Sequence, residues 1–217
     1  MTRALPAALL ALALCAAATG ARAEEGDIRD LSVGQSAAEL PQVGYVELAC
    51  AAKPDLMLDS WADYGKCPAD TDGRREVRFQ FDDSTNPRAQ YNDNLRGTRV
   101  GGHPVLISLR FTAKGVVDAI LIETDPKVRL FLKKKAFLMA LQIRERYGAE
   151  GWTCADRPKA AGEEALAGQF IKEHCEKATA TRRYAYDRDL YQKSGKDLRD
   201  FVSTTRLAIL EIGRAHV

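Results

Sequence analysis

The sequence has few of the residues and motifs on which enzymes commonly depend. It holds three histidines in 217 residues, and no Gly-x-Ser-x-Gly nucleophile motif or Gly-x-x-x-x-Gly-Lys phosphate loop occurs in it. No two cysteines form a Cys-x-x-Cys pair, which argues against a thioredoxin-type redox role. These absences favour a binding protein over an enzyme, and they predict no cofactor.

A large excess of charge of one sign is also missing. The chain has 32 basic and 30 acidic residues, and this balance predicts no nucleic-acid partner. After the N-terminus, no segment approaches the roughly 20 apolar residues of a membrane-spanning helix. We therefore expect no stable membrane insertion and a single domain over residues 24–210, a length that fits one hydrophobic core.

One apolar run does occur, near the N-terminus, and it is followed by Ala21-Arg22-Ala23. A short apolar run before a small-x-small site is typical of a cleaved export signal, although an N-terminal core helix is the alternative. Leu14, which precedes Cys15, disfavours a lipid anchor, because that processing requires a small residue there. Residues 1–23 are therefore predicted to be removed near Ala23, and the mature protein is predicted to lie in the periplasm or outside the cell.

The cysteines are predicted to form structural disulfides. The chain has five cysteines, and loss of Cys15 with the signal leaves four, an even number that favours disulfides in an oxidising compartment. The simplest of the possible pairings joins Cys50 to Cys67 and Cys154 to Cys175. Disulfides would leave a zinc site without thiolate ligands, so we expect no metal; His174 with free thiols of Cys154 and Cys175 is the alternative.

Alternating apolar and polar residues predict strands over 75–82, 103–112 and 182–191. The segment 116–124 is apolar on both faces, as an interior strand would be, and strands are also predicted over 43–50 and 203–210. Ala113-Lys114-Gly115 predicts a tight turn between the strands over 103–112 and 116–124. The segment 169–177 fits either a helix or a strand.

The segment 127–147 is predicted to form one long α-helix, with Pro126 at its first turn and Gly148 just past its end. On this helix Leu130, Phe137 and Leu141 form an apolar stripe, which lies nearly opposite a second apolar stripe of the same helix. Either the C-terminal segment covers this stripe, or it meets a partner or lines a ligand cleft. The whole pattern predicts an α+β fold, a twisted antiparallel β-sheet packed against one long α-helix and stapled by two disulfides.

The predicted function is that of an exported, non-catalytic binding or adaptor protein of the bacterial envelope, with a protein or small ligand as partner. Its candidate site residues are Leu130, Phe137, Leu141 and His103. One alternative is a small exported enzyme, such as a hydrolase, that uses His103 or His174; another is an envelope structural or assembly factor. A carboxylate or hydroxyl within hydrogen-bond reach of either histidine would favour the enzyme, and an uncovered apolar face on 127–147 would favour the binder.

The last residues, EIGRAHV at 211–217, follow the last predicted strand without a turn or cap. They can be back-translated as GAGATCGGAAGAGCACACGTC, which from its second base matches a widely used sequencing-adapter oligonucleotide. We therefore expect residues 211–217 to be a non-native read-through tail and the natural chain to continue past about Leu210.

Overall fold

The computed structural model describes residues 26–84, 97–197 and 199–212. The predicted export signal, residues 1–23, lies outside the described residues, as do residues 213–217 of the predicted read-through tail. Glu211, the first residue of that tail, ends the last strand and lies opposite Arg182.

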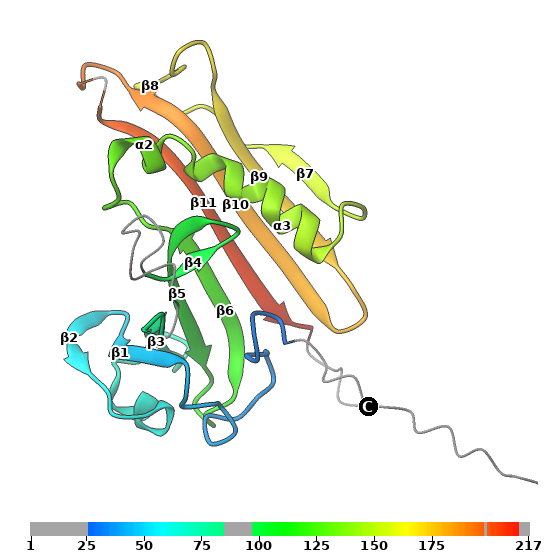
Figure 1. Cartoon of the computed structure of the whole chain (residues 1–217). Helices are drawn as coiled ribbons and strands as arrows, with labels where there is room; N and C mark the ends of the chain where they lie inside the picture. Colours follow the sequence, from blue (N-terminus) through cyan, green and yellow to red (C-terminus); the bar gives the residue numbers. More distant parts are fainter. Residues whose placement is uncertain (1–25, 85–96, 198, 213–217) are drawn as a thin grey trace, which may run out of the picture.

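One large antiparallel sheet dominates the structure, with 46% of residues in strands and 13% in helices. In the described residues its strand order is β2-β1-β3-β5-β6-β11-β10-β9-β7, with β4 paired to β5 and β8 paired to β10 (Figure 1). The strands are β1 (Tyr45–Cys50), β2 (Lys53–Met57), β3 (Arg75–Phe81), β4 (Arg99–Val100), β5 (His103–Phe111), β6 (Val117–Thr124), β7 (Thr153–Asp156), β8 (Glu163–Glu164), β9 (Ile171–Ala178), β10 (Arg182–Lys193) and β11 (Phe201–Glu211).

The hairpin of β5 and β6 forms where alternation and a glycine turn predict it. Gly115 adopts a φ of 77°, a conformation that costs glycine little because it has no Cβ. Its N–H donates to the carbonyl of Thr112 at 3.0 Å, and the N–H of Thr112 donates to Val116 at 2.9 Å. The ambiguous segment 169–177 forms most of strand β9.

The prediction of an α+β fold with one long helix over 127–147 is wrong. That segment holds the short helix α2 (Leu130–Lys133), the 3-10 turn η3 (Ala136–Leu138) and the helix α3 (Met139–Tyr147). Strand β11 supplies the reason. The N–H of Phe137 donates to the hydroxyl of Ser203 at 3.3 Å, and the hydroxyl of Thr205 donates to the carbonyl of Ala136 at 2.9 Å, so side chains of the sheet bond backbone groups that a continuous helix would pair internally.

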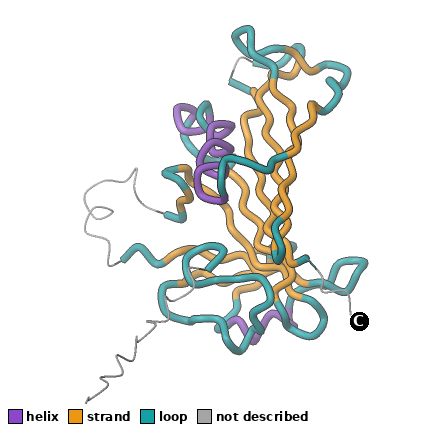
Figure 2. The backbone as a smooth tube through the Cα atoms, turned by 90° about the vertical axis from the view of Figure 1, so that its right-hand side faces the viewer, coloured by secondary structure: helices purple, strands orange, loops and turns teal. Residues whose placement is uncertain are grey.

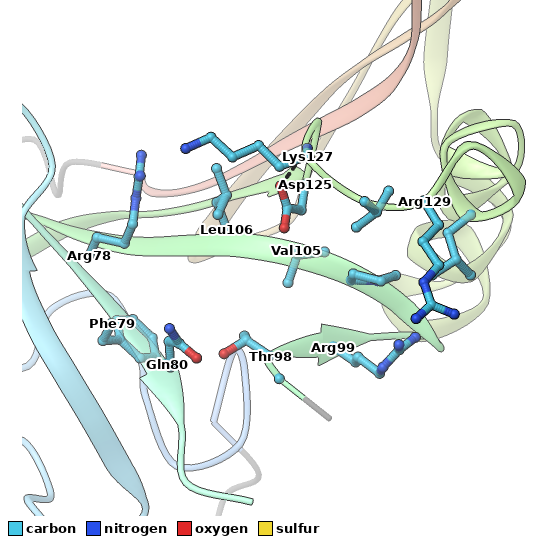
Figure 3. A pocket seen from close by; sticks show the side chains of 14 residues that line it. Arg78, Phe79, Gln80, Thr98, Arg99, Val105, Leu106, Asp125, Lys127 and Arg129 are labelled. Atoms are coloured by element: carbon cyan, nitrogen blue, oxygen red, sulfur yellow. Dashed lines mark hydrogen bonds between the residues drawn. The ribbon is translucent and has the colours of Figure 1, made fainter. Parts of the chain in front are cut away.

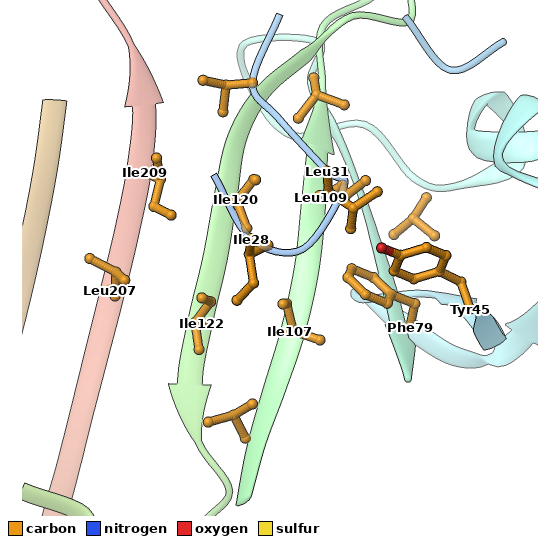
Figure 4. Close-up of a cluster of buried hydrophobic side chains, with 14 of the residues drawn as sticks. Ile28, Leu31, Tyr45, Phe79, Ile107, Leu109, Ile120, Ile122, Leu207 and Ile209 are labelled. Carbon is orange, nitrogen blue, oxygen red and sulfur yellow. The ribbon is translucent and has the colours of Figure 1, made fainter. Parts of the chain in front are cut away.

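In the described residues, α2, η3 and α3 lie together on one side of the sheet (Figure 2). On that side the inward residues of the central strands build the core, which Ile28 and Leu31 of the N-terminal segment also join (Figure 4). The 3-10 helix η1 (Trp61–Lys66) adds Trp61, which is fully buried and donates its indole N–H to the carbonyl of Pro41 at 2.8 Å. The opposite side of the sheet presents polar and charged side chains, because residues that alternate with the core residues point there.

The predicted disulfide pairing is confirmed. Cys50 and Cys67 are bonded with their Cα atoms 5.2 Å apart, which ties β1 to the end of η1. Cys154 and Cys175 are bonded with their Cα atoms 4.1 Å apart and lie opposite one another in the β7–β9 ladder. Two disulfides indicate a compartment more oxidising than the cytoplasm. Within the described ranges no helix has the length and apolar character needed to cross a membrane.

Candidate functional site

The helical segment places most of its predicted stripe at the surface. Leu130 is 39% and Leu141 is 55% exposed, and their neighbour Phe131 is 66% exposed. Phe137 is half-buried beside β11. The sheet therefore partly covers one member of the predicted stripe. Leu130 and Phe131 of α2 and Leu141 of α3 are the exposed apolar side chains of this segment, and we call them the helical surface.

Positive charge surrounds the helical surface. Residues 126–144 contain six cations and no aspartate or glutamate. The ammonium of Lys135 lies 4.2 Å from the centre of the Phe131 ring, a distance at which a cation is attracted by the face of an aromatic ring. Exposed apolar side chains and cations thus lie on the same segment.

A cleft of about 390 Å³ adjoins the start of α2. It lies between β3, the β4–β5 hairpin and the segment that leads into α2 (Figure 3). Four cations and one carboxylate line it, together with Gln80, Thr98 and apolar residues. We call it the basic cleft; its charged residues are Arg78, Arg99, Lys127, Arg129 and Asp125.

His103 lies beside the basic cleft rather than in it. It starts β5 and pairs with Val100 across the turn formed by Gly101 and Gly102. Burial lowers the pKa of His103, and the positive charges of Arg99 and Lys135 lower it further. His103 is therefore neutral at pH 7, and in the part of the chain that the structure describes no carboxylate or hydroxyl is bonded to it.

His174 lies in β9 on the side of the sheet away from the helices. Its Nδ1 is 2.9 Å from a carboxylate oxygen of Asp187, and its Nε2 is 3.1 Å from one of Glu176. The bonds to Asp187 and then Glu176 raise the pKa of His174. A carboxylate thus lies within reach of this histidine, as the enzyme alternative requires, but both ring nitrogens are occupied and neither is free to accept a proton from a substrate.

Comparison with protein families, with curated proteins and with solved structures found no match to this chain. The assignment of a site therefore rests on the geometry of the chain itself.

The alternative metal site is partly assembled. Ligand atoms of Cys154, Glu173 and Cys175 lie within 4.8 Å of one another, whereas both nitrogens of His174 are bonded to carboxylates. The two sulfur atoms are joined to each other, and a disulfide does not supply the thiolates that zinc binds.

A groove of about 350 Å³ lies on the side of the sheet away from the helices. It differs from the basic cleft in the charges that line it. Three carboxylates and two cations line the groove. Arg206 lies 2.9 Å from Glu123, and the hydroxyl of Ser108 donates to Glu76. Arg78 borders both the groove and the basic cleft. An excess of positive over negative residues is therefore a feature of the basic cleft and not of this groove.

Sequence reasoning missed the basic cleft. Its cations come from β3, β4 and the start of α2, and only the pairing of β3 and β4 with β5 brings them together. One signal was available in the sequence, because six cations without an acid over 126–144 predict a local positive surface even in a chain of balanced charge.

Proposed function

We propose that the protein is an exported, non-catalytic binding or adaptor protein of the bacterial envelope, and that its helical surface docks an acidic, partly apolar segment of another protein. The observation that supports this most directly is the exposure of Leu130, Phe131 and Leu141. In the described ranges six large hydrophobic side chains are exposed, and these are three of them. Apolar patches with polar rims are typical of interaction surfaces.

The charge around the helical surface supports the choice of an acidic partner. Lys134 and Lys135 are exposed, and so are Lys127 and Arg129 before α2. Complementary charge increases the rate of encounter and disfavours partners of the same sign. Apolar side chains of the partner would cover the exposed leucines and Phe131, and its carboxylates would meet the lysines.

The hydrolase alternative has one observation in its favour, the carboxylates beside His174. It has weaker support than binding, because the bonds to Asp187 and Glu176 raise the pKa of His174 and so favour its protonated form, and because the catalytic role of a general base requires a free nitrogen. An envelope structural or assembly factor would use the same helical surface and would differ in the identity of its partner.

Site-specific photocross-linking in the envelope of the native host tests the proposal. A photoreactive phenylalanine analogue at Phe131 should give a cross-link to a protein, and mass spectrometry of the linked peptide should identify a segment rich in aspartate or glutamate. The matched control carries the same analogue at Lys114, which is exposed in the β5–β6 turn, and should not give this product.

The contacts of the helical surface provide the second control. Leu141→Asp and Lys134→Glu should each reduce the cross-link from position 131, while circular dichroism shows an unchanged fold. A lipid adduct at position 131, or a cross-linked peptide without acidic residues, would contradict the proposal.

A further inference from the structure

The cations of the basic cleft lack the partners that other cations of this protein have. Arg182 lies 2.8 Å from Asp27, and Arg110 lies 2.8 Å from Asp118. Across residues 26–84, 97–197 and 199–212, by contrast, Arg78, Lys127 and Arg129 form no ion pair.

Arg99 is partly buried at the cleft. One nitrogen of its guanidinium donates to the carbonyl of Gly102 at 2.9 Å, but its buried Nε has no hydrogen-bond partner among the described residues. A buried donor without a partner costs free energy unless a ligand or water bonds it. Arg99 therefore has hydrogen-bonding capacity that a bound acceptor would satisfy.

The cations are arranged at both ends of the basic cleft. Figure 3 shows Arg129 pointing toward Arg99 at one end, Arg78 and Lys127 at the other, and Asp125 between them. Like charges held in one cleft repel one another, and one carboxylate does not neutralise four cations. Burial is the main cause of the lowered pKa of the neighbouring His103, and the positive charge of Arg99 lowers that pKa further.

We propose that the basic cleft binds a small anionic ligand through its carboxylate or phosphate oxygens. Arginine presents planar pairs of N–H donors that match such oxyanions. The volume of about 390 Å³ lies in the range of small-molecule sites, and Phe79, Val105 and Leu132 supply an apolar wall for the body of the ligand. This ligand is distinct from the protein partner proposed for the helical surface, although Lys127 and Arg129 border both the cleft and that surface.

Titration of the whole mature protein with simple anions tests the proposal. Inorganic phosphate and malonate, a small dicarboxylate, are the probes, and sodium chloride of matched ionic strength is the reference. At least one probe should raise the melting temperature above the reference, because a ligand that binds only the folded state stabilises it. A larger effect of phosphate would identify a phosphorylated ligand, and a larger effect of malonate a carboxylic acid.

The NMR signal of His103 gives a second measurement that needs no variant. A bound anion offsets the positive charge of Arg99, so the pKa of His103 should rise when the active probe is present. His174, on the far side of the sheet, should titrate unchanged and serves as the internal control.

Three variants locate the site. Arg129→Gln should weaken binding of the active probe about fivefold, which corresponds to about 1 kcal/mol of Coulomb attraction. Asp125→Asn should strengthen it by a similar factor, because it removes the one carboxylate and keeps the side-chain oxygen that accepts the N–H of Lys127. Lys114→Gln should leave it unchanged.

Two results would overturn the proposal. The first is that phosphate and malonate act no differently from sodium chloride on both the melting temperature and the pKa of His103. The second is that Arg129→Gln and Lys114→Gln change binding equally, which would show a general response to net charge. If Arg129→Gln does not fold, the change in the pKa of His103 in the unsubstituted protein decides whether the proposal stands.

Discussion

Replacing Cys50 and Cys67 together by alanine should destabilise the protein more than the equivalent change at Cys154 and Cys175. The sequence separations are 17 and 21. In the loop-closure model, cross-links of this size stabilise the fold by about 3 kcal/mol each, mainly by restricting the unfolded chain. Chain entropy alone therefore predicts nearly equal losses.

Burial separates the two cases. Cys50 and Cys67 are 0% and 3% exposed and belong to the hydrophobic core. In the second pair Cys175 is also buried, at 0% exposure, but Cys154 is exposed in the edge strand β7. Removing buried sulfur atoms also costs transfer and cavity free energy, here about 1 kcal/mol. We expect a loss of about 4 kcal/mol for the first double variant and about 3 kcal/mol or less for the second.

Urea denaturation of both oxidised double variants, followed by circular dichroism, measures these losses. Mass spectrometry should first confirm that the remaining disulfide is formed. A loss below about 1 kcal/mol for the first variant would refute the loop-closure argument. A larger loss for the second variant than for the first would refute the burial argument.

Three further changes test contacts of the fold. Asp27→Asn should cost about 2–4 kcal/mol in urea denaturation, because it leaves the partly buried Arg182 without its carboxylate; a loss under about 0.5 kcal/mol would contradict this. His174→Gln should destabilise the protein below a pH of about 6.5, and the difference should vanish as the pH rises through the raised pKa of the histidine; a difference that grows with pH would reverse the sign of the argument. Gly115→Ala should lower the melting temperature, because its φ is positive and the new Cβ would lie 2.8 Å from the hydroxyl oxygen of Tyr64; an unchanged melting temperature would show that the turn relaxes freely.

Local patterns predicted those parts of the fold that local physics determines. The residues of β5 and β6 alternate between core and open side, and Gly115 supplies the positive φ of their turn. The cysteine pairing followed from an even count and short separations. These features depend on residues that are close in the sequence.

The prediction of one continuous helix over 127–147 was wrong because residues far along the chain interrupt that helix. Ser203 and Thr205 bond backbone groups of Phe137 and Ala136, about 66–69 positions earlier. Nothing in the periodicity of 127–147 reveals those bonds. The α+β class was wrong for the same reason, since a single continuous helix was its main support.

The candidate site was predictable in part. The sequence identified Leu130, Phe137 and Leu141, and two of these three are exposed. It identified His103 but not the cluster of cations beside it, because Arg78, Arg99 and Arg129 lie on separate elements that only the sheet register brings together.

The place of β11 in the sheet has a consequence for the order of folding. β11 pairs with β6 on one side and along its length with β10 on the other, although it follows both in the chain. The early strands and the late strands therefore remain two separate sheets, each with an open edge, until β11 has left the ribosome. Contacts between such distant segments form slowly. We therefore expect the complete sheet to form only after β11 has been synthesised.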